Sequence, residues 1–401
     1  MTIVARRPGR EPPDPSPSVT DHPPPSTAVI FPELETPAPI VDLDRLERNL
    51  DRAARYAAEH RLGLRPHIKT HKSPRLGAEQ MKRGAVGLTC ATPFEAEVMS
   101  EVADDLLLAY PPVGPLRAKR VANLPDHVRL TVALDSATAV DDLAKAACAA
   151  EREISVYVEL DLGMHRVGLP VVDDAIALAR RIRDSAPLVF GGLAFYPGHI
   201  REAVDSQDAK LDQLRGGLGD ALSRFDRAGL TPDSVSGGST PTMWRTHEIP
   251  RVTEFRPGTY IFNDRTTAEI GACAWEDCAL TVLATVVSTA VPGQAVIDTG
   301  SKSLGREPLR GTGSDEGFGS LLEHPEVVVK GMSEEHGILD LSRSSWRPVV
   351  GERVRVIPNH VCIVVHLNDV VFGVRGDSVE TSWPVTARGR GYELQRAESF
   401  R

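Results

Sequence analysis

Eight short apolar runs alternate with helix-like stretches between residues 64 and 262, and this alternation limits the possible folds more than any other feature of the sequence. Stretches such as 173–183 and 209–228 are rich in Ala, Leu and Arg at helical spacing. This pattern is typical of a (β/α)8 TIM barrel of the α/β class. An open doubly wound sheet is the alternative, but no glycine fingerprint follows the first run. The expected barrel strands are Leu64–Lys69, Ala85–Ala91, Asp105–Tyr110, Val128–Asp135, Ile154–Asp161, Val189–Tyr196, Ser234–Gly238 and Phe255–Phe262.

After about Asp264 the pattern changes to short β-rich runs separated by Gly, Pro and Asn-Asp turns, which predicts a C-terminal all-β domain. One of the strands expected there is Ile363–His366. Before the barrel, Pro37–Leu43 is expected to form a short strand, and Asp44 to cap the helix that follows. The expected parts are a disordered Pro-rich arm at 1–28, the barrel at 29–268, the β-rich domain at 269–390 and a tail at 391–401.

Composition excludes several classes of function. The formal net charge is −9 and no long basic run occurs, so no nucleic-acid partner is expected. No apolar run approaches the roughly 18 residues that a membrane span needs. Five cysteines, an odd number, without an export signal favour a cytoplasmic location.

A cluster of cations and imidazoles lies where the first expected barrel strand ends. Lys69 is preceded by Arg65 and His67 and followed by His71 and Lys72. A desolvated lysine among other cations loses its proton easily and can hold a Schiff base. A solvated basic loop is the simpler interpretation of this stretch alone. For His71, a packing role fits as well as a role in a site.

Other candidate segments fall at the same mouth, because the carboxyl ends of barrel strands meet there. Gly237-Gly238-Ser239-Thr240 ends the seventh run before a helix-like turn, and its N–H and hydroxyl groups suit a phosphate. A barrel lysine beside a phosphate site indicates pyridoxal 5′-phosphate. The remaining mouth segments are Asp161–Arg166, Tyr196–His199 and Arg256–Tyr260, the last of which is expected on the eighth strand.

From about residue 35 to 385 the chain resembles the D-threonine aldolase and D-serine dehydratase family, the alanine-racemase-like (type III) branch of pyridoxal-phosphate enzymes. Many motifs in one order carry this resemblance. They are Arg65-Pro-His-Ile-Lys-Thr-His, Asp161-Leu-Gly-Met-His-Arg166, Tyr196-Pro-Gly-His199, Gly237-Gly-Ser-Thr-Pro-Thr, Arg256-Pro-Gly-Thr-Tyr260, Asp298-Thr-Gly-Ser-Lys302, Glu335-His-Gly337 and Pro358-Asn-His-Val-Cys362.

The resemblance implies an alanine racemase N-terminal-like barrel, a homodimer and a small D-amino acid substrate. It implies Lys69 as the Schiff-base lysine, Arg166 facing the phenolic oxygen of the cofactor and Tyr196 near its ring. His199 is a candidate accessory base. The residues expected around the phosphate are Gly238, Ser239, Thr240, Gly258 and Thr259, and Tyr260 is also expected to bind the cofactor.

His360 and Cys362 form a His-x-Cys pair in the β-rich domain. On a strand the two side chains would point to the same face and could meet one ion, although two ligands do not fill a tetrahedral site. The resemblance implies a divalent metal at this pair, with water and substrate completing its shell. A thiolate favours zinc, with manganese or magnesium as alternatives.

The predicted function is therefore a lyase for D-3-hydroxy amino acids. Retro-aldol cleavage to glycine and an aldehyde is preferred, because that activity is expected to be the commoner one among relatives. Dehydration of D-serine to pyruvate and ammonia is the alternative, which the His-x-Cys pair favours. An amino-acid racemase, a non-catalytic cofactor carrier and a metal-dependent barrel hydrolase remain less favoured alternatives.

Overall fold

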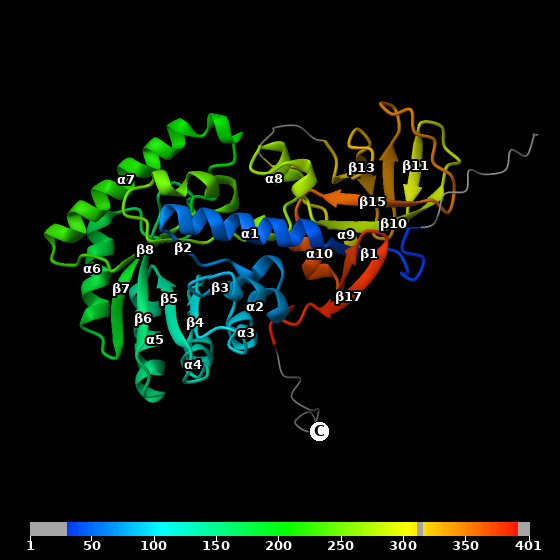
Figure 1. The fold of residues 1–401 in the computed structure, drawn as a ribbon. Coiled ribbons are helices and arrows are strands. Elements are labelled where there is room, and N and C mark those ends of the chain that lie inside the picture. The colour runs from blue at the N-terminus through cyan, green and yellow to red at the C-terminus, as the bar shows by residue number, and fades with distance from the viewer. Residues whose placement is uncertain (1–29, 311–315, 392–401) are drawn as a thin grey trace, which may run out of the picture.

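The computed structural model describes residues 30–310 and 316–391, which form two β-sheets with their helices (Figure 1). One sheet has eight strands and the other has nine. The Pro-rich arm predicted at 1–28 lies outside the described residues, as does all of the predicted tail except Gly391. Within the described ranges, no helix combines the length and the apolar character needed to cross a bilayer.

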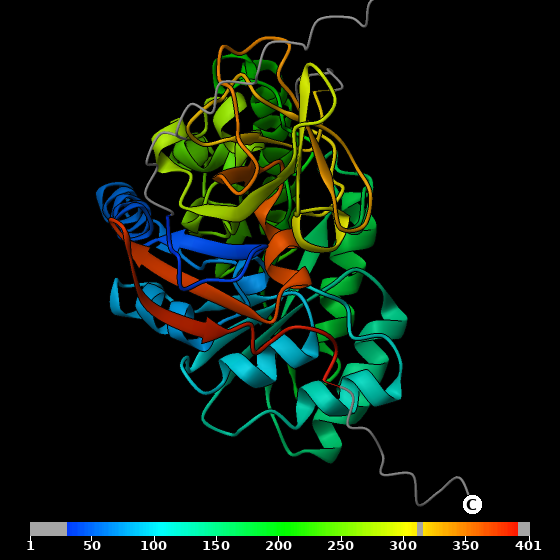
Figure 2. The same ribbon diagram turned by 90° about the vertical axis from the view of Figure 1, so that its right-hand side faces the viewer.

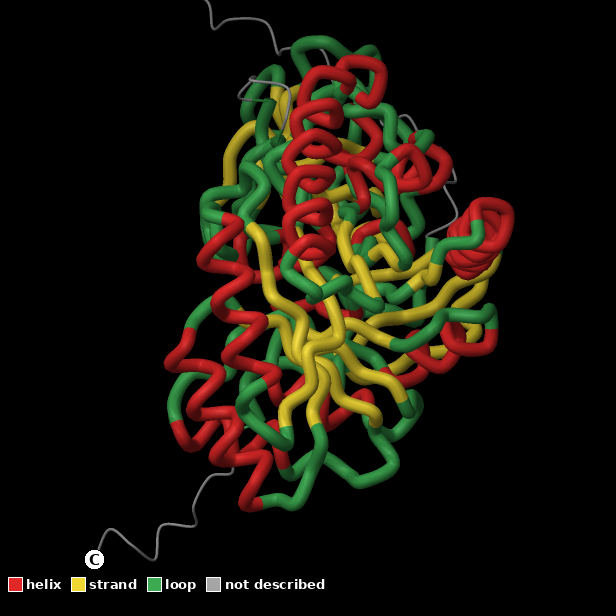
Figure 3. The backbone as a smooth tube through the Cα atoms, turned by 90° about the vertical axis from the view of Figure 1, so that its left-hand side faces the viewer, coloured by secondary structure: helices red, strands yellow, loops and turns green. Residues whose placement is uncertain are grey.

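The first sheet is parallel throughout and curls into a barrel (Figure 3). Its strand order is β2-β9-β8-β7-β6-β5-β4-β3, and a parallel bridge between His67 and Thr89 joins the two ends. The strands are mostly buried, as in other sheets whose faces are both covered. They are β2 (Gly63–Leu64), β3 (Leu88–Cys90), β4 (Asp105–Leu108), β5 (Arg129–Leu134), β6 (Ile154–Leu160), β7 (Leu188–Phe195), β8 (Ser234–Gly237) and β9 (Glu254–Phe255).

Helices cover the outside of this barrel, and 3-10 turns follow several of its strands (Figure 3). The helices are α1 (Leu43–His60), α2 (Pro74–Lys82), α3 (Pro93–Met99), α4 (Pro115–Ala122), α5 (Ala137–Ala149), α6 (Val172–Arg183) and α7 (Asp208–Arg227). The short helix α8 (Arg265–Glu269) follows the barrel and is bonded to Asn359 of the second domain. The 3-10 turns are η1 (Ile68–Thr70), η2 (Val204–Ser206), η3 (Thr240–Glu248), η4 (Thr259–Ile261) and η5 (Trp275–Asp277).

The second sheet is mostly antiparallel and forms the β-rich domain. Its main path is β13-β14-β11-β10-β1-β16-β17, and β15 joins β10 to β12. Its strands are β1 (Ala38–Asp42), β10 (Leu280–Ser288), β11 (Gln294–Ile297), β12 (Gly319–Leu321), β13 (Val329–Met332), β14 (Gly337–Asp340), β15 (Arg353–Pro358), β16 (Val370–Arg375) and β17 (Ser378–Pro384). Two short helices, α9 (Ser301–Leu304) and α10 (Val361–Leu367), lie between its strands.

Strand β1 belongs to this second sheet, although the sequence placed it in the barrel part (Figure 2). Ile40 lies opposite Thr281 of β10 in an antiparallel pair and opposite Phe372 of β16 in a parallel pair. The strand is buried because its side chains pack on both faces of the sheet, with Val41 in one apolar cluster and Ile40 in another. The helix that follows is capped by Asp42 and not by Asp44, since the Asp42 side chain accepts a hydrogen bond from Arg45 N at 3.0 Å.

The first and last barrel strands are shorter than predicted. β2 and β9 are each two residues long, and each is followed within two residues by a proline, Pro66 or Pro257. Proline cannot donate to a strand ladder, so regular pairing stops there. Both Lys69 and Thr259 were expected on strands. Lys69 instead lies on η1, and Thr259 lies on η4.

The predicted strand Ile363–His366 is part of helix α10. Val361, Val364 and Val365 are fully buried, and their spacing places them on one face of a helix. Tertiary burial of this face outweighs the β-propensity of its branched side chains.

Candidate active site

A cavity of about 190 Å³ lies between the loops at the carboxyl ends of the barrel strands and helix α10. Most of the side chains predicted for a site meet in it, from segments that are far apart in the sequence. The predicted residues that line it are Lys69, Arg166, Tyr196, Ser239, Thr240, Gly258, Thr259, His360 and Cys362. His199, Gly238 and Tyr260 were also predicted but do not line it.

The amine of Lys69 faces an aromatic ring inside this cavity. Its Nζ lies 5.6 Å from the ring centroid of Tyr196, and the guanidinium carbon of Arg166 lies 5.0 Å from the same centroid. Tyr196 therefore has a cation close to its ring from two different loops. This arrangement keeps an amine, a guanidinium and a flat ring within reach of one bound molecule.

His67 also lines the cavity, two residues before Lys69. Its Nδ1 accepts a hydrogen bond from the backbone N–H of Lys69 at 3.5 Å, so the neutral ring carries its hydrogen on Nε2. Burial, together with the positive charges of Lys69 and Arg256, holds the pKa of His67 well below its ordinary value. His67 is therefore a neutral hydrogen-bond donor to the cavity at neutral pH.

His71 has the packing role that the sequence left open. Its side chain is 1% exposed, its Nε2 lies 3.2 Å from Gln80 Oε1 and its Nδ1 accepts from Ser73 N. Gln80 in turn donates to the hydroxyl of Tyr260 at 3.0 Å. The phenol of Tyr260 thus points away from the cavity, while its backbone N–H donates to Thr240 Oγ1 at 3.3 Å.

The expected phosphate cradle is formed by hydroxyl groups and glycine backbone. Ser239 precedes η3, and Thr240 begins it. Gly238 has a φ of +98°, which only glycine adopts easily, and it turns the chain out of β8. A Cβ at Gly258 would lie 2.8 Å from Thr70 Oγ1 and 3.2 Å from the His67 carbonyl oxygen, so only a bare backbone fits there. These residues fit a phosphate group.

The His-x-Cys pair faces the same cavity, but from a helix and not from a strand. His360 is the residue before α10, and Cys362 lies in its first turn. Burial opposes ionisation of Cys362, but the charge of His360 outweighs it and lowers the pKa of the thiol to about 7. Burial would likewise lower the pKa of His360, but Cys362 and Asp264 raise it well above its ordinary value. The pair therefore offers a thiolate, which is the form that binds metal.

Asp264 orients the imidazole of this pair. Its Oδ2 lies 3.1 Å from His360 Nδ1 and accepts from Val361 N, while its Oδ1 caps α8 by accepting from Thr267 N. This leaves His360 Nε2 for a ligand, as in metal sites where a carboxylate holds the histidine. In the described ranges, no group of three or more His, Cys, Asp or Glu side chains forms a metal site. A metal at this pair would thus keep open positions for water or substrate.

The sequence interpretation missed several contributors. Arg256 lines the cavity, and its guanidinium donates to Ser236 Oγ at 2.8 Å and to the Phe195 carbonyl at 2.9 Å. Arg256 begins the Arg256-Pro-Gly-Thr-Tyr260 motif, so the sequence did contain a signal for its place at the site. Arg201, Arg310 and Asp264 had none, because nothing in their local sequence shows which distant segments they meet.

His199 lies behind the cavity. Its Nδ1 is buried without a hydrogen-bond partner in the described structure, and a Cβ at Gly163 would lie 2.9 Å from its Nε2. The ring is therefore packed against the loop after β6 and does not reach the cavity.

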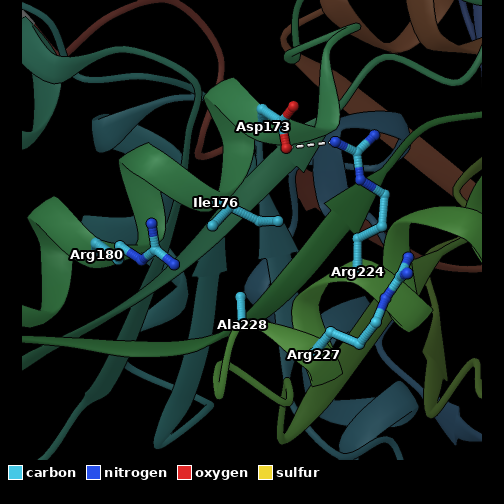
Figure 4. Close-up of a pocket in the computed structure, with 6 residues that line it drawn as sticks. All are labelled: Asp173, Ile176, Arg180, Arg224, Arg227 and Ala228. Carbon is cyan, nitrogen blue, oxygen red and sulfur yellow. Dashed lines mark hydrogen bonds and ion pairs between the residues drawn. The ribbon is translucent and has the colours of Figure 1, made fainter.

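A larger hollow, of about 540 Å³, lies on helices α6 and α7 outside the barrel (Figure 4). Arg224 forms an ion pair with Asp173 across it, and Arg180 and Arg227 lie at its rim. Asp173 is the one carboxylate among its described lining residues, and it is exposed and held in the ion pair with Arg224. The smaller cavity is therefore the candidate active site.

Comparison with known proteins identifies the family of the chain. The alanine racemase N-terminal domain family model matches residues 41–266, and a model described as a serine dehydratase domain matches residues 279–374. A 3-hydroxy-D-aspartate aldolase of Paracoccus denitrificans (strain Pd 1222) is 30% identical, over 90% of this chain and 94% of its own. D-threo-3-hydroxyaspartate dehydratase of Delftia sp. (strain HT23) is 33% identical, over 82% and 91%.

Solved structures indicate the same family. A D-threonine aldolase from Filomicrobium marinum superposes with a TM-score of 0.82 at 31% identity, covering 91% of this chain and 98% of its own. A metal-free form of D-threo-3-hydroxyaspartate dehydratase, with one cysteine replaced by alanine, superposes with a TM-score of 0.81 at 30% identity, covering 91% and 100%. A second solved variant of that dehydratase has a histidine two positions earlier replaced by alanine.

The curled parallel barrel, the lysine at its mouth and the second sheet define a pyridoxal-phosphate-dependent lyase of the alanine racemase fold. The chain belongs to the family that contains the D-threonine and 3-hydroxy-D-aspartate aldolases, D-threo-3-hydroxyaspartate dehydratase and D-serine dehydratase. The family predicted from the sequence motifs is thereby confirmed, as is the predicted combination of a barrel and a β-rich domain.

Proposed function

We propose that this chain is a metal-dependent dehydratase, which eliminates water from D-3-hydroxy amino acids to give a 2-oxo acid and ammonia. The observation that carries the proposal is the thiolate-forming pair His360–Cys362, which faces the same cavity as Lys69. The D-threo-3-hydroxyaspartate dehydratase described above has a histidine and a cysteine at the same spacing, and its cysteine variant was solved in a metal-free form. A thiolate ligand favours zinc as the native ion.

Different residues of the cavity would act at Cα and at the 3-hydroxyl of the substrate. Pyridoxal phosphate, when bound, accepts the electrons of the bond that breaks at Cα. A divalent cation at the pair would make the 3-hydroxyl a better leaving group. The Nζ of Lys69 takes the proton from Cα. Ser239, Thr240 and Gly258 would hold the phosphate group, while Arg166 and Tyr196 would orient the cofactor ring beside Lys69.

The mass balance of the proposed reaction is simple. The substrate loses the α-proton and the 3-hydroxyl as water, and the released enamine is hydrolysed to a 2-oxo acid and ammonia. Neither an oxidant nor a reductant is consumed, so the described groups and the two cofactors are sufficient.

Retro-aldol cleavage, which was preferred from the sequence, is the second candidate. Full-length similarity to 3-hydroxy-D-aspartate aldolase favours it. It needs a base for the proton of the 3-hydroxyl, and His199, the residue expected in that role, does not line the cavity. The neutral His67 carries a hydrogen on Nε2, so it is a donor there. Elimination uses Lys69 as its base and needs no further group.

Analysis of the reaction products tests the choice between dehydration and retro-aldol cleavage. Purified holoenzyme is incubated separately with D-serine, D-threonine and 3-hydroxy-D-aspartate, and 2-oxo acid, ammonia, glycine and aldehyde are quantified. We expect 2-oxo acid and ammonia in equal amounts. Formation of glycine and an aldehyde instead would show that the chain is an aldolase and not a dehydratase. We further propose a cytoplasmic homodimer, which sedimentation of the purified protein and fractionation of the producing cells would test.

A further inference from the structure

The hydroxyl group of Thr70 lies between two parts of the candidate active site. Thr70 is fully buried on η1, directly after Lys69. Its Oγ1 lies 3.2 Å from Cys362 Sγ, and a Cβ at Gly258 would lie only 2.8 Å from the same oxygen. The hydroxyl is therefore confined between the backbone of the expected phosphate cradle and the sulfur of the His360–Cys362 pair.

The position of Thr70 is fixed by its surroundings. The next residue, His71, is anchored through Gln80 Oε1 and Ser73 N. Threonine is branched at Cβ, so its side chain has few rotamers in a packed site. In the part of the chain that the structure describes, the contact with Cys362 is the one hydrogen bond of the Thr70 hydroxyl. The hydroxyl is thus a fixed polar group whose partner is a sulfur atom.

The direction of this hydrogen bond follows from the form in which a cysteine binds metal. The thiolate is the metal ligand, and it has no hydrogen to donate. A hydroxyl group can donate as well as accept. When Cys362 is a thiolate, Thr70 must therefore be the donor. Asp264 has the corresponding role for the other member of the pair, because its Oδ2 lies 3.1 Å from His360 Nδ1.

A thiolate without this donor would have a competing partner. Lys69 lines the same cavity as Cys362. A thiolate that is free to turn would be attracted to the ammonium group of Lys69 and away from a metal ion. The Thr70 hydroxyl is a neutral donor, so it can orient the sulfur without adding a charge to the site.

Resting on the metal site of the proposed function, we propose that Thr70 is a positioning residue, whose hydroxyl donates to the Cys362 thiolate and holds the sulfur towards the divalent cation. Thr70 acts through the ligand, as Asp264 does through His360. A packing role is the alternative, because Thr70 is fully buried. The donor role needs the hydroxyl group, whereas the packing role needs the branched shape of the side chain.

Two substitutions separate the hydroxyl from the shape. Zinc is titrated calorimetrically into the metal-free protein with pyridoxal phosphate bound. Thr70→Val keeps the shape and should weaken zinc binding by roughly 10- to 100-fold, the usual effect of losing an outer partner of a metal ligand. Thr70→Ser keeps the hydroxyl and should stay close to the wild type. Thr299→Val is the matched control, because Thr299 is also fully buried, has a hydroxyl partner in Ser303 Oγ at 2.5 Å and does not line the cavity.

Cobalt(II) gives a readout that a packing role would not change. A cobalt–thiolate bond absorbs light by charge transfer from the sulfur, and a hydrogen bond to that sulfur lowers the energy of its electrons. Loss of the donor should therefore shift this absorbance to longer wavelength in Thr70→Val, while Thr70→Ser keeps the wild-type band. Thr70→Ala also lacks the hydroxyl and should show the same shift, so it replaces Thr70→Val if that variant does not fold.

The outcomes distinguish this proposal from the proposed function. A wild-type protein that binds neither zinc nor cobalt would overturn both. Metal binding by the wild type, with the same affinity and the same cobalt band in Thr70→Val, would overturn the role of Thr70 alone. Weaker binding in Thr70→Ser but not in Thr70→Val would assign Thr70 to packing. Weaker binding with a shifted band in Thr70→Val, and neither change in Thr70→Ser, supports the proposal whether or not the enzyme is a dehydratase.

Discussion

The Oγ1 atom of Thr70 lies 3.2 Å from the Sγ atom of Cys362, although 292 residues separate them in the sequence. Thr70 follows Lys69 on the barrel side, and Cys362 belongs to α10 of the second domain. Thr70 is fully buried, so this contact fixes the His360–Cys362 pair next to Lys69. The reaction proposed above needs both groups on one substrate, and this contact provides the required proximity.

Replacement of Lys69 by alanine should abolish turnover and the visible absorbance of the bound cofactor, because the role proposed for the lysine is covalent. The thermal midpoint should stay close to that of the wild type, since Lys69 lines a cavity and is not packed in the core. Lys82→Ala, an exposed lysine on α2, is the control. Wild-type turnover in Lys69→Ala would refute the assignment.

Gly258→Ala should weaken cofactor binding, because its methyl group would meet Thr70 Oγ1 at 2.8 Å and narrow the phosphate cradle. We expect at least a tenfold rise in the dissociation constant for pyridoxal phosphate, measured by absorbance titration of the apoenzyme. Gly216→Ala is the matched control, since nothing lies within 4 Å of a Cβ at that position of α7. Equal cofactor affinity in both variants would place the phosphate elsewhere.

Asp264→Asn should weaken metal binding by roughly 10- to 100-fold, the usual effect of removing a carboxylate that holds a metal-binding histidine. The amide nitrogen cannot accept the hydrogen on His360 Nδ1, so the imidazole loses its fixed orientation. Calorimetric titration of the metal-free protein with zinc measures the change directly. Asp173→Asn, which alters an exposed carboxylate on α6, should leave the affinity unchanged; an unchanged affinity in Asp264→Asn as well would exclude the orienting role.

Cys362→Asp should shift metal preference from zinc towards manganese, because a hard oxygen replaces a soft sulfur. Metal content after dialysis against equal amounts of both ions, with Cys148→Ala as an exposed cysteine control, tests the shift. Chelation should stop turnover while the cofactor absorbance persists, since the phosphate cradle lies on the barrel. Full activity after complete metal removal would disprove the metal site.

The stability of the protein should fall as the pH is lowered from 6.5 towards 4, in part because of His71. Burial lowers the pKa of His71 from 6.5 to about 4, so in this range the unfolded chain takes up a proton that the folded protein does not. The pH dependence from this group disappears only above about pH 7.5, where the imidazole is neutral in both the folded and the unfolded state. At pH 5.5 the expected loss is about 1.2 kcal/mol relative to pH 7. His71→Asn should reduce this slope in urea denaturation; an identical slope would assign the acid sensitivity to other groups.

Much of the barrel could be predicted from the sequence, because buried parallel strands and amphipathic helices leave periodic patterns. Strands β4 to β8 lie close to their predicted positions. The errors occurred where the chain departs from those periods. Pro66 and Pro257 ended β2 and β9 early, and the buried face of α10 made a helix of residues with high β-propensity.

The sequence by itself determined the chemistry available at the site: Lys69 within its motif, the Ser239–Thr240 hydroxyls, and a thiol two residues from His360. Only the tertiary structure decided which groups share one cavity. It brought in Arg201, Arg256 and Arg310, excluded His199, and gave His360 a carboxylate partner in Asp264. The physical reason is that side-chain type and local period are properties of neighbouring residues, whereas contact across a cavity depends on how distant segments pack to bury their apolar faces.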